Sequence, residues 1–198
     1  MSNRRVVLPG VIIGVLLLAL AVVFAVVLPK ANGDNGDLSL PDTLPGGFSA
    51  TDLSSTWKNA PEATADKVES AAASERSART YGDNAFEAAG VDAVPRGYID
   101  EKFQQPVFVQ AFRAQGGAFS PFQFADPKSA QSGQQVQRLV RQGDAICIEV
   151  GSSDGQGGSQ PAYVQCQKSE GDLTVQVTSP LALDKAADLV DTVFDEVA

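Results

Sequence analysis

An uncharged stretch, residues 6–28, follows Arg4 and Arg5 and constrains the fold more than any other feature of the chain. An α-helix rises ~1.5 Å per residue, so this stretch would be roughly 34 Å long and could cross a hydrocarbon core of ~30 Å. We therefore predict one transmembrane helix over residues 6–28. Basic residues favour the cytoplasmic side of a span, which makes residues 1–5 a cytoplasmic tail. The predicted location is the cell membrane, with a single span, a cytoplasmic N-terminus and an extracytoplasmic C-terminal domain.

A cleaved signal peptide is the main alternative for the same residues. Ala19 and Ala21 form a small-x-small pattern that resembles a cleavage site. The apolar stretch exceeds the usual signal-peptide core of about 7–15 residues, and Val22 and Val23 continue it past that site. These two features favour an uncleaved anchor, and cleavage stays the competing interpretation. A twin-arginine export signal has only the arginine pair in its favour.

The remaining chain divides by composition into a linker and one domain. Residues 29–57 contain repeated Asn-Gly-Asp and several prolines, which favour turns and extended chain, so we predict a flexible extracytoplasmic linker. Residues 58–198 are long enough to form one domain with its own core.

Hydrophobic periodicity predicts the elements of this domain. Alternating or continuous apolar patterns predict four strands, at 106–114, 145–150, 162–168 and 173–178. Helices are predicted from Asn59 to about residue 80, over 127–142, and after Pro180. In this last helix the apolar residues repeat every three or four positions: Leu183, Ala186, Ala187, Leu189, Val190, Val193, Phe194 and Val197.

These elements predict an α+β fold. The order of strand, helix, three strands and helix favours one largely antiparallel sheet of about four strands, with helices packed on one face in two layers. Residues 91–97 contain Pro95 and Gly97 and predict a turn outside the sheet.

The chain has two cysteines, Cys147 and Cys166, on two of the predicted strands. An even pair in an extracytoplasmic domain predicts a disulfide, which would stabilise the fold by roughly 3 kcal/mol. If the cysteines face each other across a hairpin, Val150 faces Tyr163. This register places the cysteines on one face of the hairpin and Ile148 on the other.

Composition excludes several classes of chemistry. The chain has no histidine, which removes catalytic triads, histidine bases and histidine-ligated metals. Its net charge of −9 makes it a poor nucleic-acid binder, because such binding needs clustered Lys and Arg. A phosphate-binding loop motif is absent. We therefore expect no metal ion and no cofactor, and we predict that the protein is not an enzyme.

Two groups of side chains are candidates for function. Phe119, Phe122 and Phe124 lie beside glycines and a proline and predict an exposed recognition loop, although core packing of the same rings is the competing interpretation. Asp100 and Glu101 are the carboxylate pair best placed for acid–base chemistry, since glycoside hydrolysis can run on two carboxylates.

The composition, rich in Ala, Gly, Val and Asp, resembles that of small anchored envelope proteins of high-GC Gram-positive bacteria. We predict a membrane-anchored extracytoplasmic binding or interaction module that is not catalytic and whose partner is another envelope or membrane protein. The alternatives are a carboxylate-dependent hydrolase of cell-wall polysaccharide, and a sensor ectodomain that acts through a membrane partner.

Overall fold

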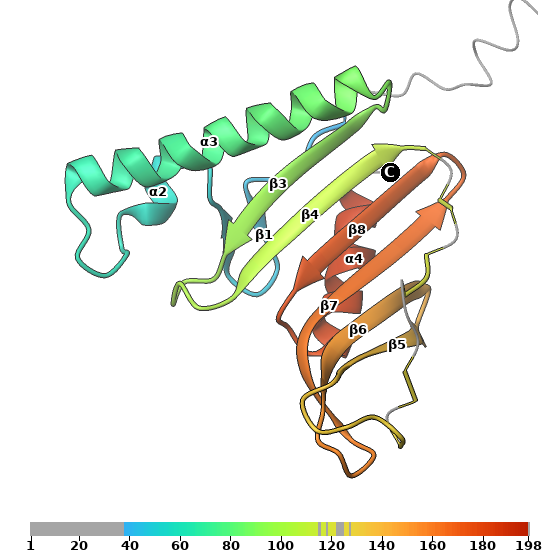
Figure 1. Cartoon of the computed structure of the whole chain (residues 1–198). Coiled ribbons are helices and arrows are strands. Elements are labelled where there is room, and N and C mark those ends of the chain that lie inside the picture. The colour runs from blue at the N-terminus through green and yellow to red at the C-terminus, as the bar shows by residue number, and fades with distance from the viewer. Residues whose placement is uncertain (1–37, 115, 118, 122–124, 127, 198) are drawn as a thin grey trace, which may run out of the picture. The chain divides into compact units, whose positions relative to one another are not determined.

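The structure is a computed structural model, and it describes residues 38–197 except 115, 118, 122–124 and 127. The described residues belong to one compact unit that begins at Leu38. They form eight strands and three helices (Figure 1). The strands are β1 (Thr43–Leu44), β2 (Phe48–Ala50), β3 (Ala93–Ile99), β4 (Pro106–Arg113), β5 (Gln135–Gln142), β6 (Ala145–Ser153), β7 (Ser159–Glu170) and β8 (Leu173–Ser179). The helices are α2 (Ser54–Trp57), α3 (Ala65–Ala88) and α4 (Leu183–Val197).

All eight strands belong to one antiparallel sheet with the order β1-β2-β3-β4-β8-β7-β6-β5. Most neighbours in this order are also neighbours in sequence. The exception is β8, which returns to lie between β4 and β7. The sheet therefore brings β4 next to a strand that begins about sixty residues later.

One face of the sheet packs against α4 and carries the core. Along β4, Val107, Val109 and Ala111 alternate onto this face and are almost completely buried. The apolar stripe of α4 packs against β6, β7 and β8 and joins the same core. Its buried residues are Ala186, Ala187, Leu189, Val190, Val193 and Phe194. The sequence predicted this stripe, because its 3.6-residue period gives the helix one continuous apolar side.

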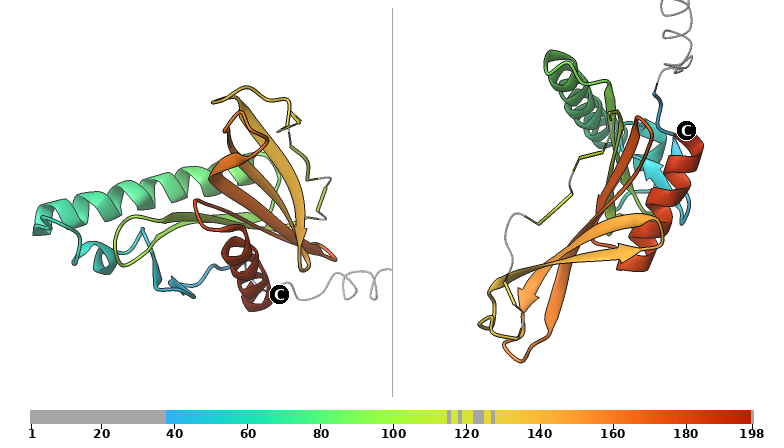
Figure 2. Two further views of the ribbon diagram at one scale, coloured as in Figure 1. Left: turned by 90° about the horizontal axis from the view of Figure 1, so that it is seen from below. Right: turned by 90° about the vertical axis from the view of Figure 1, so that its right-hand side faces the viewer.

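The opposite face carries α3. Figure 2 shows α3 and α4 on opposite sides of the sheet. Helix α3 begins after Thr64, whose side chain accepts a hydrogen bond from the Lys67 backbone N–H. Of the described α3 residues, Ala72 is the buried one. The helix thus lies against β3 and leaves much of the neighbouring sheet face uncovered.

Cys147 and Cys166 form a disulfide, with their Cα atoms 4.0 Å apart. The predicted register is confirmed: Cys147 pairs with Cys166, and Val150 pairs with Tyr163. Both cysteines are fully buried in the core that α4 covers.

The predicted fold class is wrong in the size of its sheet and in the placing of its helices. The sheet has eight strands instead of about four, and helices lie on both of its faces. The predicted helix at 127–142 contains β5, and the predicted turn at 91–97 overlaps β3. Residues 38–57 of the predicted linker carry β1, β2 and α2, with Leu40, Leu44 and Phe48 buried.

The predicted membrane location is also corrected. Within the part of the chain that the structure describes, no helix has both the length and the apolar character needed to cross a membrane. The predicted span at 6–28 and the tail at 1–5 lie outside the described residues. A membrane location therefore forms no part of the function proposed below.

Candidate binding site

Two adjoining pockets lie between α3 and the sheet, with volumes of about 450 Å³ and 340 Å³. They share Thr51, Glu75, Gly97 and Phe108, so we treat them as one site, the α3 groove. The side chains that define this groove are Trp57, Glu75, Phe86, Phe108, Gln110, Tyr163 and Thr178. They come from two helices and three strands that only the folded sheet brings together.

Two aromatic rings of the groove are exposed. Phe108 on β4 is 43% exposed and Tyr163 on β7 is 39% exposed. Phe108 lies on the face opposite Val107 and Val109, because successive side chains of a strand alternate between faces. Apolar rings are usually covered in a folded domain, so exposed rings beside a cavity indicate a contact surface.

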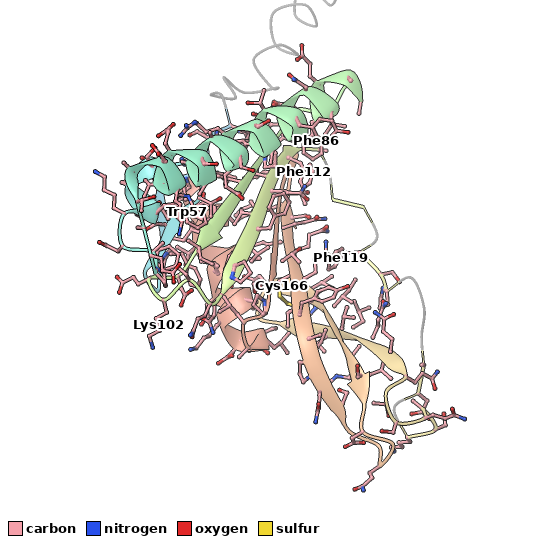
Figure 3. The ribbon with its side chains drawn as sticks, turned by 60° about the vertical axis from the view of Figure 1, so that its left-hand side comes forward. Trp57, Phe86, Lys102, Phe112, Phe119 and Cys166 are labelled. Atoms are coloured by element: carbon pink, nitrogen blue, oxygen red, sulfur yellow. A yellow bond between two sulfur atoms is a disulfide. The ribbon has the colours of Figure 1, made fainter. Side chains whose placement is uncertain are left out.

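The two ends of the groove are held by aromatic contacts. Trp57 packs against Phe103, with ring centroids 5.8 Å apart, and its Nε1 donates to the backbone oxygen of Thr51 at 2.7 Å. Phe86 and Phe112 meet edge to face at 5.6 Å. Figure 3 shows the Phe86–Phe112 pair near one end of α3 and Trp57 near the other. The Phe86–Phe112 contact joins α3 to β4, and the Trp57–Phe103 contact joins α2 to the turn between β3 and β4.

Between these ends, Gly97 of β3 lies close to both Thr51 and Glu75 of α3. A Cβ atom at this position would lie 2.9 Å from Thr51 Oγ1 and 3.5 Å from a Glu75 carboxylate oxygen. The missing side chain leaves room for the Thr51 hydroxyl to donate to Glu75 Oε2 at 2.8 Å. Glu75 therefore links α3 to Thr51, and its carboxylate accepts a hydrogen bond from the Thr51 hydroxyl.

Behind the groove lies a buried ion cluster centred on Arg96, which is 5% exposed. Its guanidinium pairs with Asp52 at 2.9 Å and with Asp42 at 2.8 Å, and it donates to the backbone oxygen of Leu40 at 2.7 Å. Arg79 of α3 pairs with the other oxygen of Asp52 at 2.6 Å. The cluster thus joins three parts of the chain: the segment before β1, the sheet, and α3.

The electrostatics of this cluster keep Asp52 ionised. Burial alone would raise the pKa of Asp52, but hydrogen bonds and charge from Arg96 and Arg79 outweigh burial and hold the pKa below its usual value. Burial raises the pKa of Tyr98 as well, so its hydroxyl stays protonated and donates to the Pro41 oxygen at 2.8 Å. The charges of the two arginines and the two aspartates therefore balance within the cluster, and their ion pairs hold together the chain segments around the groove.

The described residues that follow β4 lie beside Thr174 and Ser169, which are on the same face of the sheet as Phe108. The Thr174 hydroxyl donates to the Ala114 oxygen at 2.9 Å, and Gly116 lies so close to Ser169 that a Cβ atom there would collide with it. Phe119, a predicted binding residue, is half-buried in the connection from β4 to β5 (Figure 3). Phe122 and Phe124 lie outside the described residues.

The predicted carboxylate pair lies in the turn between β3 and β4. Asp100 Oδ1 accepts the backbone N–H groups of Gln104 and Gln105 at 2.7 and 2.8 Å. These hydrogen bonds hold the pKa of Asp100 below its usual value. Glu101 lies against Gly47. In this arrangement Asp100 acts as the hydrogen-bond acceptor of a turn.

No family model, curated protein or solved structure matches this chain. Among the described residues, no group of three or more Cys, Asp or Glu side chains is arranged to hold a metal ion.

The α3 groove is not predicted from the sequence. Both faces of the 106–114 strand carry apolar residues, such as Phe108 and Val109, so the pattern does not distinguish the open face from the covered one. One residue of the strand does indicate the open face: Gln110 is polar and lies on the same face as Phe108, so this face is more accessible to water than the face of Val107 and Val109.

Proposed function

We propose that this protein is a non-catalytic binding module and that the α3 groove is its binding site. The observation that carries the proposal is the exposure of Phe108 and Tyr163 in one pocket. Aromatic side chains supply much of the contact energy of binding sites, because they bury a large rigid area at small entropic cost.

The rigidity of the groove walls supports binding rather than turnover. Arg79, Asp52 and Arg96 are committed to one another, and Glu75 accepts a hydrogen bond from Thr51. Their contacts give the groove a preformed shape, which lowers the entropic cost of binding. An acid–base pair would instead need carboxylates that are free to exchange protons with the bound molecule.

Trp57 makes the proposal directly testable, because it is the single tryptophan of the chain and lines the groove. The full-length chain would be titrated with neutral oligosaccharides, with peptides that lack tryptophan, and with fatty acids, while Trp57 fluorescence is followed. At least one class should give a saturable change, and the bound molecule should be recovered chemically unchanged.

Two variants locate the binding. Phe108→Ala should weaken it at least tenfold, whereas Tyr81→Ala should leave it unchanged, because Tyr81 is a 78% exposed ring on α3 outside the groove. Equal binding by the Phe108→Ala variant, or conversion of the ligand to product, would contradict the proposal.

A further inference from the structure

The sheet face beside α3 carries uncharged polar side chains between its aromatic rings. Gln110 on β4, Gln176 on β8 and Gln167 on β7 lie directly opposite one another in successive strands. In the next row, Phe108, Thr178 and Gln165 are aligned in the same way. Gln110 and Thr178 line the groove, and the other three glutamines are half-buried on the same sheet face, one and two strands beyond Gln110 and Phe108.

Two of these side-chain amides are held in place by a hydrogen bond between them. Gln176 Nε2 donates to Gln167 Oε1 at 2.8 Å. A side-chain amide carries two N–H donors and an acceptor oxygen, so each glutamine of this pair keeps further hydrogen-bonding capacity after the bond is made. The row therefore presents both donors and acceptors at positions fixed by the sheet.

From this arrangement, and resting on the binding function proposed above, we infer that the α3 groove binds a neutral carbohydrate chain. The apolar faces of sugar rings stack on aromatic side chains, and sugar hydroxyls exchange hydrogen bonds with amides. Phe108 and Tyr163 supply the rings, and the glutamine row supplies the amides. The strands of these two rings, β4 and β7, lie two spacings apart, about 10 Å, comparable with the length of a disaccharide.

The charges of the groove favour this ligand over the alternatives. An anionic polymer needs clustered free cations, but Arg79 and Arg96 are both paired with Asp52. An apolar lipid chain would cover the remaining amide donors and acceptors without offering them hydrogen bonds, which disfavours its binding. The Glu75 carboxylate that lines the groove also disfavours an anionic ligand, in a protein whose net charge is −9, whereas a neutral chain of hydroxyl groups meets no such repulsion.

A protein or peptide partner is also less well suited to this surface. An extended peptide gains most by adding to a free strand edge, whereas β4, β8 and β7 are interior strands of the sheet. A protein interface has an apolar core and buries about 800 Å² on each side. The groove floor instead alternates rings with amides.

The test titrates the full-length chain with chitohexaose, cellohexaose and maltohexaose, followed by Trp57 fluorescence and by calorimetry. At least one of these neutral hexasaccharides should bind saturably. Phe108→Ala and Tyr163→Ala should each weaken binding at least tenfold, and Gln176→Ala about threefold. Tyr81→Ala should leave the affinity unchanged. The affinity should also be the same at low and high salt, because the ligand carries no charge.

The outcomes separate this inference from the proposed function. Absence of binding by all three hexasaccharides overturns the inference, and so does binding that survives both Phe108→Ala and Tyr163→Ala. A third outcome is that a peptide or fatty acid binds in the same assay instead, and that the Phe108→Ala substitution abolishes this binding. That outcome overturns the carbohydrate inference alone and leaves the groove as a binding site. If no class gives a Phe108-dependent signal, both proposals fail.

Discussion

At the scale of single residues, Arg96 shows how this chain places a charge in its interior. A buried charge is tolerated when opposite charges and hydrogen bonds satisfy it. Arg96 meets both needs through Asp52, Asp42 and the Leu40 oxygen. Because these partners lie before β3 in the sequence, the arginine also fixes the N-terminal segment of the unit against the sheet.

Asp52→Ala should therefore be strongly destabilising at neutral pH, by about 3 kcal/mol, because it leaves Arg96 buried without its main partner. The folded-state pKa of Asp52 is lowered, so the stabilisation is present above the unfolded-state pKa of ~3.9 and is lost as the pH falls through the folded value. Urea unfolding should show a large difference between wild type and variant at pH 7 and a smaller one near pH 3.

Asp42→Ala is the matched control, because the Asp42 side chain is 70% exposed and its ion pair with Arg96 is screened by water. It should destabilise the protein by less than about 1 kcal/mol. A constant difference between wild type and Asp52→Ala from pH 7 to pH 3 would contradict the assigned role of the Asp52 carboxylate.

Gly151 illustrates a second requirement at the residue scale. The pairing of β6 with β7 shifts between Val150 and Gly151, and a Cβ atom at Gly151 would collide with the backbone oxygen of Gln160. Backbone cannot move aside as a flexible side chain can. Gly151→Ala should lower the free energy of unfolding by roughly 1–3 kcal/mol in urea titrations.

Gly117→Ala provides the comparison, because no described heavy atom outside its immediate chain neighbours lies within 4 Å of a Cβ atom at Gly117. It should change stability by less than about 0.5 kcal/mol. Equal effects of the two substitutions would show that the close approach at Gly151 is relieved at little cost.

At the scale of elements, the two long helices are attached in different ways. Helix α4 buries six residues in the core, whereas α3 buries Ala72 and relies on ring contacts and ion pairs near its ends. Helices with few buried contacts open more readily than those in the core. This weaker attachment is what leaves the α3 groove open beside the helix.

Ala72→Leu should push α3 outward from the elements it packs against, because the small side chain of Ala72 is completely buried. We expect a loss of roughly 1–3 kcal/mol and faster amide hydrogen exchange along α3 than along α4. Ala73→Leu adds the same bulk on the exposed side of the helix and should leave both quantities near the wild-type values. Unchanged exchange in the Ala72→Leu variant would contradict this account of the contact.

At the scale of the described unit, the sheet separates a structural face from a binding face. The face under α4 contains the continuous core and the disulfide, while the other carries the α3 groove. Stability and binding can therefore be altered separately. The disulfide is the clearest case, because both cysteines lie in the core and neither lines the groove.

Replacing both Cys147 and Cys166 by Ala should lower the free energy of unfolding by about 3 kcal/mol, since the disulfide closes a loop with a sequence separation of 19. Urea unfolding of the oxidised protein and the double variant measures this difference. Binding at the groove should keep its affinity under conditions where the variant is folded. A variant as stable as the wild type would contradict a structural role for the disulfide.

The local pattern of the sequence predicted several elements well. The α4 stripe, the strand containing Val107 and Val109, and the register of the hairpin with Cys147 and Cys166 were all recovered. In each case the pattern is carried by residues that are close in sequence. Helical or strand periodicity decides such elements before tertiary contacts form.

The missed strands depend on neighbours that are distant in sequence. Val136, Leu139 and Val140 of β5 are compatible with a helix as well as a strand, and pairing with β6 decides between them. Pro95 argued against a strand, because proline cannot donate to a ladder. In the described pairing, β2 reaches only Tyr98 and Ile99 of β3, so Pro95 lies on the free edge, where the missing donor costs little.

The sequence by itself determined the disulfide, the C-terminal helix and the alternation of the central strands, because each follows from periodicity or residue chemistry over a short span. Only the tertiary structure decided the size of the sheet and the position of the α3 groove. The fold places Trp57, Phe108 and Tyr163 around one pocket. In this fold β4 and β7 are separated only by β8, and α3 packs against β3. That arrangement results from burying both sides of one sheet, which is a property of the whole unit and not of any local segment.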